Sequence, residues 1–154
     1  MVLIRRATAS DVPVCANLML EHPVWQSYGY AFDDQCERLN RLFSDRQVLI
    51  ADNDGAIRGF IVFDTRTLGD NGYVQLVAVD SRFTGNGIGE RLMKAAHAAM
   101  APLQRCFLLC TSTNVQAQRF YRRRGYVKVG ELPDWLQVGT TEYVFCHYHI
   151  QSSD

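Results

Sequence analysis

Apolar and polar residues alternate at the start of the chain and then recur at helical spacing. Val2 to Arg6 alternates, which predicts a first strand. Ser10-Asp11-Val12-Pro13 offers an N-cap with proline in the first turn, so we expect a helix from there to about Glu21. A second helix is predicted after a cap at Asp33 or Asp34. It ends before position 47, and its core positions are Cys36, Leu39, Leu42 and Phe43.

Between these helices, the chain from Trp25 to Phe32 is aromatic and has no clear period. It follows His22-Pro23, which breaks the first helix. We therefore expect a loop whose aromatic side chains could wall a pocket.

Three β-rich runs follow. Gln47 to Asp52 and Ile57 to Asp64 are separated by Asn53-Asp54-Gly55, a strong hairpin signal, and Tyr73 to Val79 is the third run. The pattern predicts an antiparallel meander of three strands.

The remainder of the chain alternates between helical and strand patterns. A helical period runs from Gly87 to near Pro102, and Asn114 caps a second helix that ends at Gly125. Ala117, Phe120 and Tyr121 are expected to face inward on that second helix. The predicted strands are Cys106 to Cys110, Tyr126 to Gly130 and Thr141 to His149, with a long irregular loop at Glu131 to Gly139.

Size and charge narrow the class of protein. A chain of 154 residues with 47% hydrophobic content predicts one domain, 1–154, with its own core. Lys+Arg and Asp+Glu are 16 each, which disfavours a nucleic-acid or membrane partner and makes any anion site a local one. Without a signal or membrane-spanning pattern, we expect a soluble, cytoplasmic protein.

The five cysteines are interpreted as reduced core residues, because they are odd in number and form no Cys-x-x-Cys pair. Cys106 and Cys110 should lie on one face of a strand. No histidine or third cysteine stands near them to complete a zinc site.

Thr84-Gly85-Asn86-Gly87-Ile88-Gly89 places three glycines where a helix begins. Glycine reaches positive φ at low cost, so such a loop can turn several backbone N–H groups toward one anion, and the helix N-terminus adds to the attraction. The sequence therefore predicts a phosphorylated ligand, and a plain strand-to-helix turn is the alternative.

This segment resembles the Q/R-x-x-G-x-G/A motif of the GNAT superfamily of acyl-CoA N-acyltransferases, with Thr84 in place of Gln or Arg and both required glycines, Gly87 and Gly89, present. Arg82 matches the motif in another register that fits the helix start less well. Asn114-x-x-Ala117-x-x-Phe120-Tyr121, followed by Gly125-Tyr126, is similar to a second motif of the superfamily. The likeness spans nearly the whole chain.

The resemblance implies an α+β fold with a mixed, mostly antiparallel sheet of about seven strands and about four flanking helices. It also implies that acetyl-CoA is the acyl donor and a primary amine the acceptor. The implied cofactor-binding residues are Val77, Ala78 and Val79 on the fourth strand, the loop residues Thr84, Gly85, Asn86, Gly87, Ile88 and Gly89, and also Asn114 and Tyr121.

Tyr121 matches the family's catalytic general acid, which gives the departing thiolate its proton. A core aromatic remains the alternative for Tyr121, and a simple helix cap the alternative for Asn114. Arg122-Arg123-Arg124 either complements the helix dipole or contacts CoA phosphates.

No general base is assigned, because Tyr73, Gln75 and Leu76 occupy the strand where a glutamate is common in the superfamily. Possible bases through water are Glu21, His22, Asp64, Glu131 and Asp134, although such groups are usually just solvated. Gly130 to Trp135 and Glu142 resemble the tail of small family members and should border the acceptor pocket.

Two other functions are weighed against the enzyme. A noncatalytic acyl-CoA-binding module is favoured by Thr84 and by the missing carboxylate. A dinucleotide-binding domain is disfavoured, because the glycine loop follows a meander rather than the first strand of a βαβ unit. A homodimer is expected from the resemblance.

Overall fold

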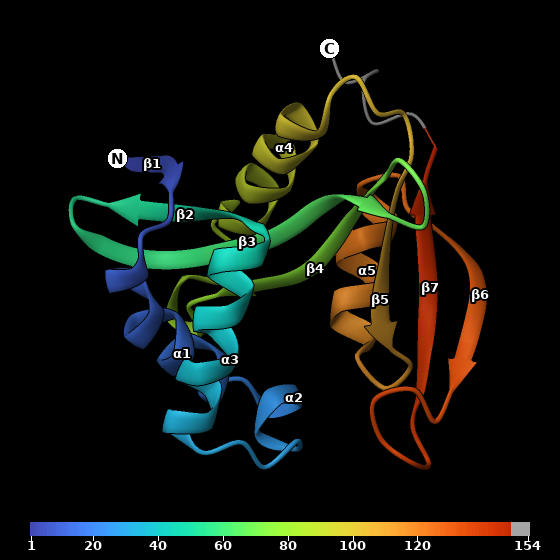
Figure 1. Ribbon diagram of the computed structural model, residues 1–154, viewed down its shortest axis with the longest axis horizontal. Coiled ribbons are helices and arrows are strands. Elements are labelled where there is room, and N and C mark those ends of the chain that lie inside the picture. The colour runs from blue at the N-terminus through green and yellow to red at the C-terminus, as the bar shows by residue number, and fades with distance from the viewer. Residues whose placement is uncertain (149–154) are drawn as a thin grey trace. The chain divides into compact units, whose positions relative to one another are not determined.

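The computed structural model describes residues 1–148, so the His149 end of the last predicted strand lies outside the described residues. The chain forms two compact units, one from 1–63 and 76–99 and the other from 64–75 and from 100 onward. The first contains β1 (Val2–Arg6), α1 (Val12–Leu20), α2 (Pro23–Gln26), α3 (Phe32–Asp45), β2 (Gln47–Asn53) and nearly all of α4 (Ile88–Met100). Figure 1 labels these elements.

Two strands, β3 (Ala56–Thr67) and β4 (Asn71–Val79), run through both units. The second unit also contains β5 (Cys106–Thr111), α5 (Val115–Arg123), β6 (Val127–Pro133) and β7 (Thr141–His147).

All seven strands belong to one sheet with the order β1-β2-β3-β4-β5-β7-β6. β4 pairs with β5 in parallel, from Gly72 opposite Cys106 to Val74 opposite Leu108. The β1–β2, β2–β3, β5–β7 and β6–β7 pairs are antiparallel. The predicted mixed, mostly antiparallel seven-strand α+β fold is therefore confirmed.

The turn between β2 and β3 confirms the predicted hairpin. Asp54 and Gly55 both have positive φ, 54° and 88°, as a two-residue type I′ turn requires. The Gly55 N–H donates to the Asp52 carboxylate at 2.7 Å. Beyond the turn the register shifts, so that Arg58 is an extra residue, a β-bulge.

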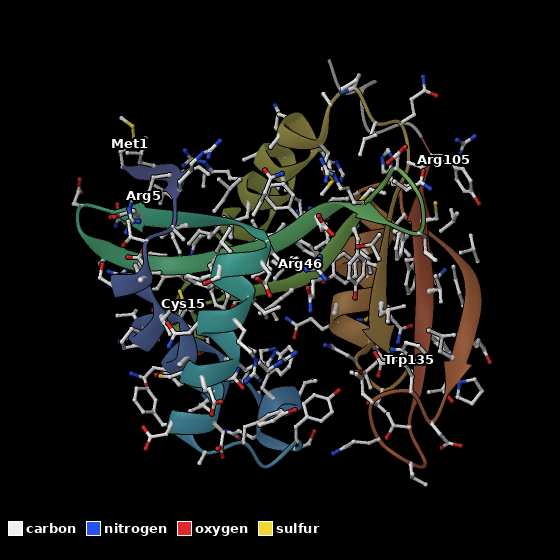
Figure 2. The ribbon with its side chains drawn as sticks, viewed as in Figure 1. Met1, Arg5, Cys15, Arg46, Arg105 and Trp135 are labelled. Carbon is white, nitrogen blue, oxygen red and sulfur yellow. The ribbon has the colours of Figure 1, made fainter. Side chains whose placement is uncertain are left out.

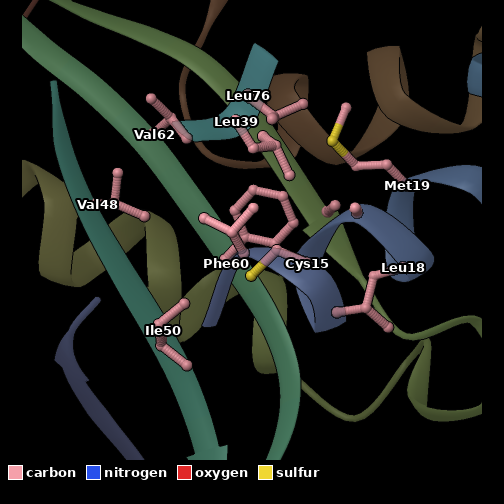
Figure 3. Packing of buried hydrophobic residues seen from close by; sticks show 12 residues of the cluster. Cys15, Leu18, Met19, Leu39, Val48, Ile50, Phe60, Val62 and Leu76 are labelled. Atoms are coloured by element: carbon pink, nitrogen blue, oxygen red, sulfur yellow. The ribbon is translucent and has the colours of Figure 1, made fainter. Parts of the chain in front are cut away.

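In the first unit, strand β3 is buried on both of its faces over Gly59–Phe63. On one face, Phe60 lies among Cys15, Leu39 and Leu76 (Figure 3), and the rest of this core comes from α1, α3 and the strands β2, β3 and β4. On the other face, a Cβ on Gly59 would meet the side chains of Ile88 and Leu92 from α4. The first unit therefore has helices on both sides of β3.

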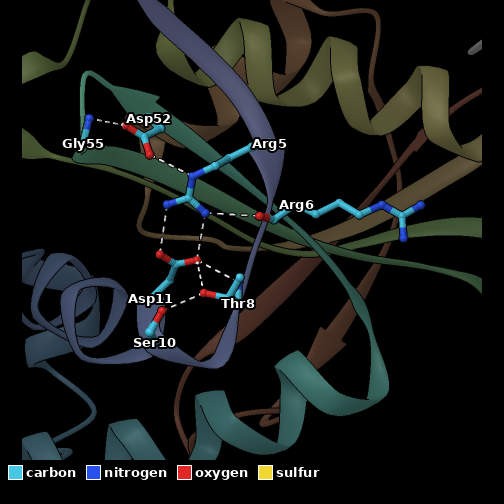
Figure 4. Close-up of polar contacts among 7 residues, drawn as sticks. All are labelled: Arg5, Arg6, Thr8, Ser10, Asp11, Asp52 and Gly55. Carbon is cyan, nitrogen blue, oxygen red and sulfur yellow. Dashed lines mark hydrogen bonds and ion pairs between the residues drawn. The ribbon is translucent and has the colours of Figure 1, made fainter.

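The start of α1 differs from the prediction. Asp11 occupies the N-cap position, but its side chain does not cap α1. It accepts the Thr8 N–H at 2.7 Å and both terminal nitrogens of Arg5 at 2.9 and 3.0 Å, while Arg5 Nε donates to Asp52 at 2.8 Å (Figure 4). Arg5 thus links the first strand, the turn before α1 and the β2 hairpin. The Arg5 guanidinium holds the pKa of Asp11 below its usual range.

Three boundaries also differ from the predictions. Part of the expected aromatic loop forms α2, because the His22 side chain caps it, accepting the Val24 N–H at 3.3 Å, and Pro23 suits its first turn. Helix α3 begins at Phe32 after Ala31, so Asp33 and Asp34 lie in its first turn rather than at its cap. Strand β6 extends to Pro133 and shortens the expected 131–139 loop.

In the second unit, β5 buries alternate residues, Cys106, Leu108 and Cys110. Tyr121 of α5 packs against this layer, with its ring 6.5 Å from Phe145 of β7. The five cysteines are free thiols, and both Cys106 and Cys110 are buried on one face, as predicted. The loop after β6 exposes Trp135 (Figure 2). Leu136 and Val138 of the same loop are exposed as well.

Within residues 1–148, none of the helices combines the length and apolar character needed to cross a bilayer.

Gly59→Ala should destabilise the protein by about 1–3 kcal/mol, because the new Cβ would lie 2.8 Å from the Ala78 carbonyl oxygen, which is backbone and cannot move aside. Gly130→Ala is the matched control in a strand, since its Cβ would meet Val144 at an ordinary 3.9 Å. Urea unfolding of both variants measures the difference, and equal stabilities would contradict the role of this close approach.

Candidate functional site

The glycine loop joins a short 3₁₀ turn, Ser81–Phe83, to the start of α4. Gly85 and Gly87 have φ of 84° and 76°, a region that other residues rarely adopt. A Cβ at either position would meet no described atom within 4 Å, so the loop borders open space. Both glycines are therefore needed for the backbone path and leave room for a ligand.

The polar side chains of this loop donate hydrogen bonds to the 3₁₀ turn before it. Thr84 Oγ1 donates to the Ser81 carbonyl at 2.9 Å, and Asn86 Nδ2 donates to the Phe83 carbonyl at 3.1 Å. These bonds hold the loop in shape, so the groups suited to an anion are its backbone N–H groups. Thr84 therefore stabilises the loop through its hydroxyl group, whereas an arginine at this position would carry a positive charge.

The N-terminus of α4 continues the same arrangement. The Arg91 N–H donates to the Gly87 carbonyl at 3.0 Å, which closes the first helical turn. The N–H groups before it lack partners within the helix and carry the positive end of the helix dipole. Ile88 and Leu92 are buried and fix this helix end in the first unit.

Asp80, just before the loop, is 1% exposed and binds two arginines. Its carboxylate accepts from Arg82 N at 3.1 Å, Nε at 3.0 Å and Nη2 at 2.8 Å, and Arg58 Nη1 lies 3.5 Å from it. The Arg58 guanidinium also stacks over Phe83, 3.9 Å from the ring centroid. This cluster anchors the approach to the loop, and hydrogen bonds from Arg82 lower the pKa of Asp80.

Sequence reasoning missed Asp80. The sequence around it, Asp80-Ser81-Arg82, places an acidic residue two positions before a basic one in a turn. This pattern is too common to predict a buried ion pair by itself. The bulged Arg58 could not be connected to Asp80 without the fold.

Val77, Ala78 and Val79 lie on β4 in the same unit as the loop. Ala78 is buried, whereas Val77 and Val79 are partly exposed on the alternate positions. The β4–β5 ladder covers Gly72–Val74, before these residues. Their role as backbone donors to a thioester remains a prediction.

Asn114 and Tyr121 lie in the second unit. Asn114 caps α5, as predicted, because its Oδ1 accepts the Ala117 N–H at 3.1 Å. Tyr121 is half-buried and makes edge contacts with Phe120 and Tyr126 at 5.3 and 6.0 Å. Burial raises the pKa of Tyr121, so the phenol stays protonated at neutral pH.

Two of the three arginines after Tyr121 make structural contacts. Arg124 Nη1 donates to the Phe120 carbonyl at 2.9 Å, which satisfies a free carbonyl at the helix end. Arg122 lies over Phe145 at 5.3 Å. The helix-end role is thus confirmed for Arg124.

Most of the possible bases make local contacts. His22 caps α2, and burial lowers its pKa. Asp64 accepts from Thr65 N and Thr67 Oγ1, Glu131 pairs with Lys128, and Asp134 accepts the Gly139 N–H.

Glu142 is the buried carboxyl of the second unit, with 2% exposure. It accepts a hydrogen bond from Thr111 Oγ1 at 2.9 Å, and burial raises its pKa. Thr111 pairs with Glu142 and Cys110 with Tyr143, so Glu142 lies on the opposite face of this ladder from Cys110.

No group of three metal-binding side chains occurs among residues 1–148.

Comparison with known proteins gives one family. The model of the Acetyltransferase (GNAT) family matches residues 17–126. No curated protein matches the chain.

Several solved structures share the fold. A protein from Pyrococcus horikoshii OT3 has a TM-score of 0.82 at 17% identity, covering 97% of this chain and 99% of that one. A GNAT-family acetyltransferase from Bacillus cereus ATCC 10987 has a TM-score of 0.77 at 19% identity, with coverage of 97% and 98%. A ribosomal-protein-alanine N-acetyltransferase from Brucella melitensis has a TM-score of 0.73 at 19% identity, with coverage of 95% and 99%.

Asp80→Asn should lower the free energy of unfolding at pH 7 by about 1–3 kcal/mol, because it removes a charged acceptor from two arginines. The folded-state pKa of Asp80 is depressed, so its stabilising contribution is present above the unfolded pKa of about 4 and is lost as pH falls through the folded pKa. Urea unfolding at pH 7 and pH 3 should show the difference from wild type shrinking at the lower pH. The exposed Asp70→Asn serves as control.

Proposed function

The chain belongs to the GNAT acetyltransferase family, and from that premise we propose that it is an N-acetyltransferase using acetyl-CoA. The acceptor is a primary amine of a small molecule or peptide. The amine attacks the thioester directly in a ternary complex, forming the C–N bond as the C–S bond breaks.

The observation that carries this proposal is the geometry of the 84–89 loop. Two glycines at positive φ border open space at the N-terminus of a 13-residue helix, where backbone N–H groups and the helix dipole favour a pyrophosphate. Thr84, Gly85, Asn86, Gly87, Ile88 and Gly89 would bind the pyrophosphate of CoA. Val77, Ala78 and Val79 would supply backbone groups near the thioester, and Asn114 would also contact the cofactor.

Direct attack is supported by the state of the cysteines. Burial raises the pKa of Cys106 to about 11 and those of Cys15 and Cys110 to about 12, so these thiols are protonated at neutral pH. A protonated thiol is a poor nucleophile, which disfavours a covalent acyl-enzyme on them. Free thiols also fit a reducing compartment, and we propose the cytoplasm.

Tyr121 is the proposed general acid. Its raised pKa keeps a proton on the phenol, and the CoA thiolate would take that proton as it leaves. The general base is not assigned to a residue.

A noncatalytic acyl-CoA-binding module is the second candidate. Gln75 stands on β4 where a carboxylate is common in the family, and Thr84 carries no charge. Acetyl-CoA binding without transfer to any amine in a broad panel would favour this candidate over the enzyme.

Tyr121→Phe should lower kcat by about 10²-fold while leaving the Kd for acetyl-CoA nearly unchanged, because only the proton donor is lost. Tyr126→Phe is the matched control, a buried tyrosine that packs against Tyr121. Steady-state kinetics and isothermal titration measure the two quantities. An unchanged kcat in Tyr121→Phe would remove this residue from the mechanism.

Gly87→Ala should raise the Kd for acetyl-CoA about tenfold or more, since it strains a residue at positive φ and places a methyl group in the open space. Gly55→Ala carries the same kind of strain in the β2–β3 turn and should keep normal binding. Thermal shifts with acetyl-CoA, succinyl-CoA, NAD and ATP report the ligand class. Stabilisation by NAD or ATP alone would refute the acyl-CoA proposal.

A further inference from the structure

Arg38, on α3, carries a half-buried positive charge that no acidic side chain of residues 1–148 pairs with. Among residues 1–148 it makes no hydrogen bond or ion pair, and its Nη1 is sealed from solvent without an acceptor. Arg41, nearly one turn later, is exposed and pairs with Glu37 at 3.1 Å. The same helix therefore shows an arginine whose charge is matched and one whose charge is not.

The Arg38 guanidinium lies over two aromatic rings instead. Its central carbon is 5.2 Å from the Trp25 ring and 5.7 Å from the Tyr30 ring. Tyr28 packs edge-on against Trp25 at 5.5 Å, and Trp25 itself packs against the core. Stacking of this kind orients a guanidinium and shields it from water while leaving its charge uncompensated.

Other arginines with a buried unbonded nitrogen differ from Arg38. In Arg58 and Arg124 that nitrogen is Nε, and each of these side chains has another polar partner, Asp80 and the Phe120 carbonyl. In Arg38 the unbonded nitrogen is the terminal Nη1, which has two N–H donors. No carboxylate or carbonyl of residues 1–148 accepts from the Arg38 side chain. A buried donor left unpaired destabilises the folded state, so it needs an explanation.

The position of Arg38 separates it from the cofactor loop. Helix α3 covers the Phe60 face of β3, whereas α4, whose N-terminus carries the loop, covers the Gly59 face. Within the first unit, an anion on Arg38 and a pyrophosphate on residues 84–89 would lie on opposite faces of the strand. CoA phosphates on the loop are therefore not the anion that Arg38 would bind.

We propose that Arg38, held by Trp25 and Tyr30, binds a carboxylate of the acceptor, so that the preferred acceptors are small amines that also carry a carboxylate. This inference rests on the proposed transferase function. A planar guanidinium matches a carboxylate with two parallel hydrogen bonds, which a point charge does not reproduce. The Trp25 and Tyr30 rings orient the plane of the Arg38 guanidinium.

A binding experiment tests the site without the reaction. Trp135→Phe leaves Trp25 as the single tryptophan, because the chain has two. Its fluorescence should change saturably on titration with N-acetylglycine, a carboxylate without an amine, and not with N-acetylglycinamide. Adding Arg38→Met, which keeps an aliphatic stem over Trp25, should abolish the change. Equal responses to both probes, or a response that survives Arg38→Met, would overturn the proposal.

A kinetic experiment tests the consequence for substrate choice. Amino acids and their amides are compared as acceptors with acetyl-CoA, and the acid should exceed the amide in kcat/KM by about 10- to 100-fold, as expected for charge-assisted hydrogen bonds. Arg38→Met should remove this preference with little change in kcat/KM for the amide. Arg38→Lys should retain the preference only in part, and the control Arg41→Met should retain it fully.

The two proposals fail in different ways. Transfer to amides without any preference for acids would overturn the role of Arg38 and leave the transferase intact. Absence of transfer to every amine would refute the transferase, while the fluorescence titration would still decide whether Arg38 binds a carboxylate.

Discussion

Burial of β3 on both faces is the constraint on which the first unit depends. A strand covered on both sides needs apolar residues at successive positions, and Gly59–Phe63 meets this need. One face joins α1 and α3 through Phe60, and the other meets α4, while a Cβ at position 59 would lie 2.8 Å from the Ala78 carbonyl oxygen. The packing of Ile88 and Leu92 therefore fixes the N-terminus of α4, and with it the glycine loop, against this strand.

The two buried carboxylates of the first unit are matched by positive charge, whereas the half-buried charge of Arg38 is not matched by an acid. Asp11 and Asp80 are almost fully buried, and each is surrounded by arginine nitrogens and backbone N–H groups at hydrogen-bond distance. A buried carboxylate without such partners would be costly, so these clusters fix where β1, the first turn and the approach to the loop lie. Arg38 packs on aromatic rings but has no carboxylate partner within the described residues 1–148.

The donor side of the proposed reaction rests on backbone geometry, and the acceptor side on side chains. A loop that works through N–H groups tolerates Thr84 where the family has Gln or Arg, because threonine supplies the same N–H. Recognition of an acceptor needs particular side chains, and the proposed ones, Arg38, Trp25 and Tyr30, belong to α3 and to the segments before it. The same fold can therefore keep its cofactor while its acceptor changes.

Local spacing was enough to predict the strands, the main helices, the Asp54-Gly55 turn, the Asn114 cap and the glycine loop. Each depends on residues within a few positions of one another, through side-chain alternation, helical period or glycine at positive φ. Helix α2 was missed because its cap, His22, is an uncommon one, and the end of β6 because Glu131–Pro133 has a weak strand pattern. Only the tertiary structure decided that Asp11 binds Arg5 and Asp52, that Asp80 binds the bulged Arg58, and that Glu142 is buried beside Thr111. It also decided that Arg38 lies over the Trp25 and Tyr30 rings and, among residues 1–148, forms no ion pair. These partners meet through packing and strand register between separate elements, and no periodicity along the chain records which of them will be neighbours.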